Sequence, residues 1–243
     1  MLGFLKRLFA GPEERRPFCS AILAAGGSSS RMGGENKLFA SVGGMPVLAR
    51  SVLALVGSPL VDEIVIAVRE EDLLAAADLC KAYGLEKPLK IVVGGATRLE
   101  SVMAALLECS DQAQLVAVHD GARPLVTREI IDRTIEKAQE AYAAAPAVPV
   151  KDTIKVAENG IVLETPDRSK LFSVQTPQVF DRSLLSAALQ AAKDAGTTVT
   201  DDCSAVERLG KEVYLTEGSY ENIKITTPED LALAEAILER RGA

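Results

Sequence analysis

The chain has 243 residues, of which 48% are hydrophobic, so it can bury the core of one large α/β domain or of two small ones. Its formal net charge of −7 argues against nucleic-acid and anionic-membrane partners, because such partners bind clustered lysine and arginine side chains. No apolar run approaches the roughly 20 residues that a membrane span requires, so we expect a soluble protein with no membrane partner.

The four cysteines, Cys19, Cys80, Cys109 and Cys203, lie far apart in the sequence and form no CxxC pair. This spacing favours neither a zinc site nor a disulfide framework. Free cysteine usually behaves as a small, buried, apolar residue. We therefore expect four buried thiols and a cytoplasmic protein.

Residues 1–17 begin with an apolar and basic segment that lacks the long hydrophobic core and the cleavage site of a secretory signal. We interpret this segment as a frayed N-terminal tail. A short amphipathic helix that contacts a membrane or a partner is the alternative. The rest of the chain, residues 18–243, is expected to form one domain.

Apolar runs alternate with helical patterns along the first part of that domain. The runs predict strands that are buried on both faces, at 19–24, 61–68, 89–93 and 114–118. The helical patterns cover 46–56, 70–83, 97–109 and 127–143. Residues suited to helix N-termini are Thr97 with Glu100, Thr127, Asp181 and the TPED segment at 227–230.

Strands and helices that alternate at this spacing imply right-handed βαβ crossovers. The sequence therefore predicts an α/β fold with a doubly wound, mostly parallel sheet. In such sheets ligands bind beyond the carboxyl ends of the strands. The loops that follow the strands are thus where binding and catalytic residues are expected.

Residues 151–175 break this alternation. Two stretches of alternating polarity flank Glu158, Asn159 and Gly160, and Asn-Gly between such stretches is a strong hairpin signal. The hairpin has little apolar bulk of its own, so it either packs on its own domain or embraces another subunit. We interpret residues 151–175 as a protruding β-arm.

The loop within residues 23–38, LAAGGSSSRMGGENKL, is rich in glycine and serine. Such residues let backbone N–H groups approach a phosphate without obstruction by a Cβ atom. The glycine spacing fits neither the GxGxxG fingerprint nor the P-loop. Arg31 and Lys37 add two cations that suit phosphate oxygens and a transition state of growing negative charge. A glycine-rich loop with solvated charges is the alternative.

The second loop, GGATRLES, follows the strand predicted at 89–93. Gly94 and Gly95 permit close backbone approach, and a helix that starts at Thr97 would direct its N-terminal N–H groups toward the same rim. An ordinary turn between a strand and a helix explains this segment equally well.

The third loop, HDGARP, follows the strand predicted at 114–118. We expect Asp120 to be a Mg²⁺ ligand, because that ion prefers oxygen donors and the residue ends a strand at the crevice. Gly121 leaves room for a ligand, and Arg123 can pair with an anion. His119 is the only histidine, and we expect it to make a structural hydrogen bond rather than to act as a general base.

Two further cations are candidates on weaker signals. Lys224 lies in NIKIT, residues 222–226, whose alternation predicts a strand, and an exposed strand face accounts for it equally well. Arg168 lies near the end of the hairpin, where a solvated surface charge is the default interpretation.

Seven segments, taken together and in this order, resemble the 2-C-methyl-D-erythritol 4-phosphate cytidylyltransferase family of the non-mevalonate isoprenoid pathway. They are LAAGGSSSRMGGENKL, GGATRLESV, HDGARP, PVKDTIK, TPQVF, TDDCSAVE and NIKITTPEDLALAE. The resemblance implies a Rossmann-like nucleotidyltransferase that uses CTP, methylerythritol phosphate and Mg²⁺. It also implies a homodimer whose β-arm reaches the neighbouring subunit's site.

The resemblance also assigns roles to residues. Arg31 and Lys37 match the residues that stabilise the transition state, and Asp120 matches the metal-binding aspartate. Nucleotide-binding positions are Ala24, Ala25, Gly26, Gly95, Ser101 and Gly121. Substrate-binding positions are Arg168 and Lys224, with Thr153, Thr200 and Arg123 in support.

This reaction needs no general base, because a phosphate monoester has its second pKa at about 6 and attacks as the dianion. A ribitol-5-phosphate cytidylyltransferase is the nearest alternative. A nucleotide-binding module without catalysis is the alternative from another class. An NAD-dependent enzyme is less favoured, because the glycine spacing and the following ribose-binding acid are missing.

Overall fold

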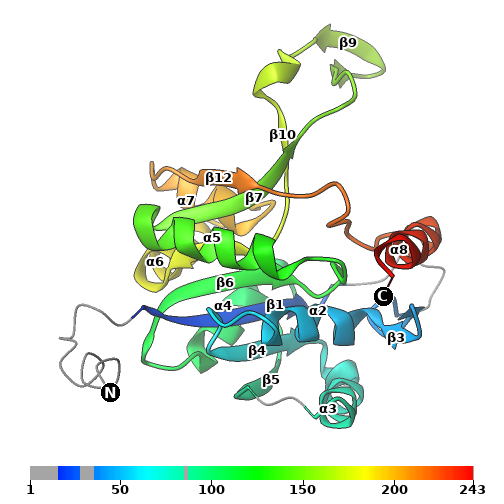
Figure 1. Cartoon of the computed structure of the whole chain (residues 1–243). Helices are drawn as coiled ribbons and strands as arrows, with labels where there is room; N and C mark the ends of the chain where they lie inside the picture. The colour runs from blue at the N-terminus through cyan, green and yellow to red at the C-terminus, as the bar shows by residue number, and fades with distance from the viewer. Residues whose placement is uncertain (1–15, 28–35, 85–86, 243) are drawn as a thin grey trace, which may run out of the picture.

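An eight-stranded sheet with helices on both faces forms the body of the molecule (Figure 1). The computed structural model describes residues 16–27, 36–84 and 87–242. Four neighbouring strands run parallel in the order β5-β4-β1-β6. Their bounds are β1 Phe18–Ala25, β4 Glu63–Val68, β5 Leu89–Val93 and β6 Ala113–Asp120.

The other half of the sheet is mixed. Its strands are β7 Ala143–Pro149, β10 Phe172–Val174, β11 Gln178–Asp181 and β12 Tyr214–Glu217. β11 pairs antiparallel with both β6 and β7, β10 pairs antiparallel with β7, and β12 pairs parallel with β7. The expected doubly wound, mostly parallel α/β sheet is confirmed.

Each face of the sheet has its own hydrophobic core. In β1, Ala21 and Leu23 belong to one core and Ile22 belongs to the other, as the two-residue period of a strand requires. The first core is covered by α2 Val47–Val56, α3 Leu73–Ala82, α5 Arg128–Ala141 and α8 Pro228–Arg241. The second is covered by α4 Arg98–Glu108, α6 Arg182–Asp194 and α7 Asp202–Arg208.

The predicted helix starts are largely confirmed. Thr97 and Glu100 form a capping box, and the Asp181 carboxylate accepts a hydrogen bond from the Leu184 N–H at 2.9 Å. Thr227 forms a second capping box ahead of Pro228 at the first helical position. Thr127 occupies the N-cap position of α5, but its side chain makes no capping bond.

One sequence prediction about a strand and one about the end of a helix were wrong here. β5 is an edge strand, so it is only half-buried and Val93 is 45% exposed. The predicted helix at 127–143 ends at Ala141, and Ala143 begins β7 instead.

The hairpin of the β-arm is confirmed. β8 Val156–Glu158 pairs antiparallel with β9 Ile161–Glu164, and positive φ angles of 50° at Asn159 and 79° at Gly160 turn the chain between them. The arm projects away from the sheet beyond β7 and β10 (Figure 1). A short helix, η4 Arg168–Lys170, lies on the return path.

Smaller features complete the described chain. They are the two-stranded hairpin of β2 Ser41–Val42 with β3 Met45–Pro46, and the short helix η3 Glu70–Asp72. Arg16 donates to both carboxylate oxygens of Asp62, so the last part of the expected tail is attached to the domain. All four cysteines are buried, as expected. Within the described ranges, no helix has the length and apolar character to cross a membrane.

Candidate active site

A cavity of about 560 Å³ opens at the carboxyl ends of β1, β4, β5 and β6. The strand order reverses at β1, which has β4 on one side and β6 on the other. Ligands bind at such a point of reversal in doubly wound sheets, so the cavity lies where the fold predicts a ligand. Its lining residues include Gly26, Gly27, Lys37, Arg69, Gly94, Gly95, Arg98, Ser101, Asp120 and Lys224. Cations and small residues thus line the cavity together with two carboxylates, Asp120 and Glu70.

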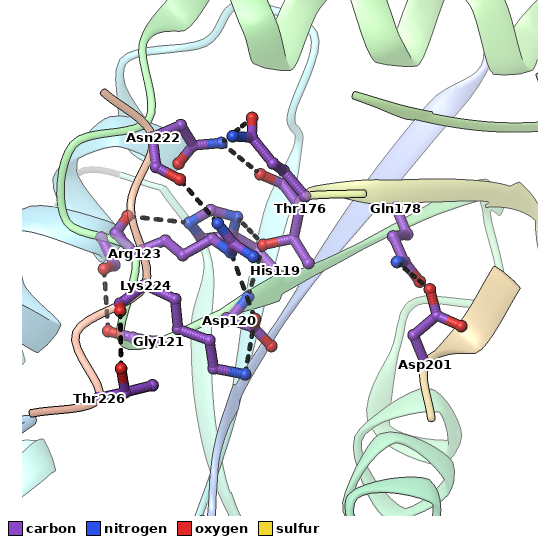
Figure 2. Close-up of polar contacts among 12 residues, drawn as sticks. His119, Asp120, Gly121, Arg123, Thr176, Gln178, Asp201, Asn222, Lys224 and Thr226 are labelled. Atoms are coloured by element: carbon purple, nitrogen blue, oxygen red, sulfur yellow. Dashed lines mark hydrogen bonds and ion pairs between the residues drawn. The ribbon is translucent and has the colours of Figure 1, made fainter. Parts of the chain in front are cut away.

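Asp120 ends β6 and contacts three cationic side chains, of which Figure 2 shows Arg123 and Lys224. Its Oδ2 lies 3.0 Å from Lys224 Nζ and 3.4 Å from Arg123 Nε, and its Oδ1 lies 3.7 Å from an Arg98 nitrogen. Burial alone would raise the pKa of Asp120, but these three cations hold it well below its usual range. The carboxylate is therefore ionised at neutral pH and can neutralise or coordinate a cation.

Arg98 joins Asp120 to a second buried carboxylate. Its guanidinium donates to Asp202 Oδ2 at 2.7 Å, and Asp202 is only 1% exposed. Gln178 supports this end of α7, because its Oε1 accepts from the backbone N–H of Asp202 at 3.0 Å and its Nε2 donates to Asp201 at 2.7 Å. Arg98 and Asp202 were not singled out as site residues from the sequence.

His119 lies beneath the site, and its two ring nitrogens are both hydrogen-bonded. Nε2 is 3.2 Å from the Arg123 carbonyl oxygen, which can only accept, so Nε2 carries the proton. Nδ1 then accepts from the Thr176 hydroxyl at 2.9 Å, and that hydroxyl accepts from the Asp120 N–H at 3.0 Å. Complete burial lowers the pKa of His119 to about 4. The expected structural role of this histidine agrees with these contacts.

Lys224 is positioned by an extended segment that is not a strand. The predicted strand at 222–226 was wrong, because the segment has no ladder partner in the sheet. Hydrogen bonds to neighbouring loops hold it instead: among them, Ile225 N–H donates to the Ala122 carbonyl at 2.8 Å, and Arg123 donates to the Asn222 carbonyl at 2.7 Å. Ile225 is fully buried, so the lysine between these anchors reaches Asp120.

The glycines at the rim are required by close packing. A Cβ atom on Gly95 would lie 2.2 Å from the Glu100 Cβ, and one on Gly94 would lie 2.7 Å from the Ser101 Oγ. Ser101 Oγ accepts from the Gly95 N–H at 3.1 Å. The start of α4 therefore lies directly against this turn, beside the cavity.

Comparison with known proteins decides the family. The family model described as IspD, 2-C-methyl-D-erythritol 4-phosphate cytidylyltransferase, matches residues 19–240. The chain belongs to this family. The resemblance inferred from the seven segments is thereby confirmed, and so is the expected enzyme class, a nucleotidyltransferase.

Relatives named 2-C-methyl-D-erythritol 4-phosphate cytidylyltransferase align with most of this chain. The cytidylyltransferase of Desulforamulus reducens is 46% identical over 225 residues, which are 91% of this chain and 96% of that protein. The Bacillus anthracis protein is 44% identical over 218 residues, which are 89% of this chain and 96% of that protein.

Solved structures of the family share the fold. The 4-diphosphocytidyl-2C-methyl-D-erythritol synthase of Anaerococcus prevotii is 32% identical, with a TM-score of 0.83 and coverage of 92% of this chain and 97% of that one. The cytidylyltransferase of Thermus thermophilus is 35% identical, with a TM-score of 0.73 and coverage of 92% and 100%.

The cavity brings together many of the residues that the resemblance to the cytidylyltransferases assigned. These are Ala24, Ala25, Gly26, Lys37, Gly95, Ser101, Asp120 and Lys224. Gly121 and Arg123 are not among the lining residues, but Gly121 directly follows Asp120 in the chain and Arg123 contacts it. The other predicted transition-state cation, Arg31, lies outside the described residues.

Four predicted substrate-binding residues do not line this cavity: Arg123, which contacts Asp120, and three that lie elsewhere. Thr200 is exposed and directly precedes the N-cap of α7. Thr153 and Arg168 are exposed on the β-arm, where Arg168 donates to the Lys151 carbonyl at 2.8 Å. Their assigned roles in a cytidylyltransferase site remain predictions.

Proposed function

We propose that this chain transfers CMP from CTP to 2-C-methyl-D-erythritol 4-phosphate and releases pyrophosphate, a reaction of non-mevalonate isoprenoid biosynthesis. One observation carries the proposal: in a chain of this family, one cavity at the carboxyl edge of the sheet is lined by Lys37 and by ionised Asp120 with its ionic partners Arg98 and Lys224. Two polyanions must meet in this reaction, and cations that neutralise and align them lower its barrier.

The proposed nucleotide site is the glycine-rich side of the cavity. Gly26, Gly95 and Ser101 would hold CTP together with Ala24, Ala25 and Gly121, because small side chains leave backbone N–H groups accessible. Lys37 would stabilise the charge that builds up on the phosphates, and we assign the same role to Arg31. Lys224 and Arg123 would hold the sugar phosphate.

Asp120 is the proposed Mg²⁺ ligand. Among the described residues no group of three or more His, Cys, Asp or Glu side chains could hold a metal ion, so these residues would supply at most two carboxylates. That fits Mg²⁺ in nucleotide sites, where substrate phosphates and water supply the other oxygens. The ionised state of Asp120 suits this role. When bound, the ion would neutralise phosphate charge.

The acceptor phosphate needs no general base, because it is already largely a dianion at neutral pH. The only histidine of the chain is buried and already uses both ring nitrogens in hydrogen bonds. The residues at the cavity therefore have to bind, neutralise and align the two substrates rather than to move a proton.

A homodimer is the second part of the proposal. The arm exposes apolar side chains that a lone subunit leaves in water: Ile161 is 68% exposed, Leu163 is 62% exposed and Phe172 is 45% exposed. Exposed apolar groups gathered on one element indicate a contact surface. The arm also carries Thr153 and Arg168, which would reach the cavity of the neighbouring subunit.

The test is pyrophosphate release from CTP in the presence of methylerythritol phosphate and Mg²⁺. We expect Lys37→Ala to lower kcat at least about a hundredfold while the fold is retained. Lys81→Ala is the matched control, because Lys81 is exposed in the last turn of α3, and it should keep native turnover. Near-normal turnover of Lys37→Ala would contradict the role of this lysine.

The same assay separates the alternative functions. Ribitol 5-phosphate in place of methylerythritol phosphate should give no pyrophosphate above background, and release with the ribitol compound alone would mean that the substrate is assigned wrongly. Binding of CTP without release for either acceptor would favour the non-catalytic module.

A further inference from the structure

Asp72 is a buried carboxylate beside the cavity that the proposed reaction does not use. It is 7% exposed and occupies the N-cap position of α3. An aspartate at an N-cap usually accepts hydrogen bonds from the first turn of its helix. Asp72 makes no such bond, so helix capping does not explain it.

Both oxygens of Asp72 are instead bonded to side chains from two loops at the cavity. Oδ1 accepts from Asn36 Nδ2 at 2.9 Å, and Oδ2 accepts from Arg69 Nε at 2.9 Å. Arg69 lines the cavity, and Asn36 directly precedes Lys37, which lines it too. One carboxylate therefore joins the loop after β4 to the turn that carries Lys37.

Asn36 in turn fixes the backbone on both sides of Lys37. Its side-chain oxygen accepts from the Leu38 N–H at 3.1 Å, and its backbone carbonyl accepts from the Phe39 N–H at 3.0 Å. Leu38 is only 3% exposed, and its carbonyl accepts from the Leu48 N–H at 2.8 Å. Lys37 thus lies in a turn that is held by the core on one side and by Asp72 on the other.

We propose that Asp72 is a positioning residue for this reaction, which sets the Asn36–Lys37 turn so that the lysine reaches the reacting phosphates. The proposal rests on the role of Lys37 stated above. A displacement of about 1 Å at a catalytic group can cost up to about a hundredfold in rate, so a fixed turn matters to turnover. Asp72 itself touches neither substrate nor metal in this scheme.

The experiment measures kcat and the KM for the acceptor in Asp72→Ala and Asn36→Ala, each made in the native chain and in Lys37→Ala. Glu71→Gln is the matched control. Glu71 also pairs with Arg69, at 2.6 Å, but its side chain is 69% exposed and it makes no bond to Asn36. The melting temperature of each variant is measured in parallel.

In the native background, we expect Asp72→Ala and Asn36→Ala to lower kcat about tenfold, with the KM for the acceptor within about twofold of native. In the Lys37→Ala background, the same changes should lower kcat by less than about twofold further, because they act through that lysine. Glu71→Gln should keep native kcat.

Two results would overturn the proposal. One is native kcat in both Asp72→Ala and Asn36→Ala. The other is an undiminished tenfold loss in the Lys37→Ala background, which would mean that Asp72 acts through Arg69 or through stability alone. If Asp72→Ala does not fold, Asn36→Ala decides between these outcomes. Native turnover of Lys37→Ala itself would instead refute the proposed role of Lys37, so the two failures are distinguishable.

Discussion

Arg98 lies between two carboxylates and is bound more closely to the one that the reaction does not use. Its contact with Asp202 is 2.7 Å, whereas its contact with Asp120 is 3.7 Å, beyond hydrogen-bond distance. Asp202 therefore holds the guanidinium partly away from the proposed metal ligand. Oδ1 of Asp120 thus faces the cavity with a weaker ionic contact than Oδ2, which Lys224 approaches to 3.0 Å.

His119 makes the stability of the protein depend on pH. Its pKa is about 4 in the folded chain, because the ring is buried, and about 6.5 in the unfolded chain. The unfolded chain thus binds more protons between these values, so stability is complete above pH 6.5 and falls as the pH drops through this window. We expect the free energy of unfolding to fall by about 2 kcal/mol between pH 7 and pH 5 from this group.

Urea unfolding at the two pH values, in the native chain and in His119→Gln, measures this contribution. Glutamine cannot titrate, so the variant should lose about 2 kcal/mol less than the native chain over the same interval. Both chains contain Asp120 and Arg123. Subtracting the loss of unfolding free energy in the variant from that in the native chain therefore cancels the contributions of these two residues. Equal pH dependence of both chains would show that His119 is not the titrating group.

Individual site residues were predictable where the signal is local. Asp120 and His119 follow a recognisable buried strand, and that position places them at the carboxyl edge of the sheet. Arg98 was not predictable in the same way, because its ionic partner Asp202 lies 104 positions away in the sequence. Only the tertiary fold, which brings the first residue of α7 to the first residue of α4, forms that pair.

At the scale of the elements, two helices with the same N-cap residue offer a direct comparison. Thr97 of α4 accepts a hydrogen bond from the Glu100 N–H at 3.1 Å, whereas Thr127 of α5 makes no capping bond. Thr97→Ala should therefore lower the free energy of unfolding by about 1 kcal/mol, and Thr127→Ala by a few tenths at most. Chemical denaturation of both variants checks this, and equal losses would mean that the capping box adds no stability.

The parallel strands were predictable, whereas β7 was not. β1, β4 and β6 are continuous apolar runs, as expected of strands that are covered on both faces. β7 has the sequence AAAPAVP, and alanine and proline are poor strand formers. It pairs with β10, β11 and β12, so tertiary pairing overrides local preference there.

For the whole molecule, the decisive feature is that the proposed site residues do not all lie at the cavity. Lys37, Asp120 and Lys224 line the cavity, whereas Thr153 and Arg168 belong to the arm that projects from the other half of the sheet (Figure 1). The arm was recognisable from Asn159 and Gly160. Its proposed contact with a second subunit was suggested only by the family resemblance, because a sequence contains no direct record of contacts between subunits.

A mixed dimer tests most directly the central claim that one active site combines the cavity of one subunit with the arm of its partner. Lys37→Ala and Arg168→Ala chains with different tags are co-expressed, the mixed dimer is isolated by both tags, and pyrophosphate release is measured. Each variant alone should be nearly inactive. The mixed dimer should regain about half of the native turnover, since one of its two sites combines an intact Lys37 with an intact Arg168. A mixed dimer as inactive as its parents, or two active parents, would contradict the account.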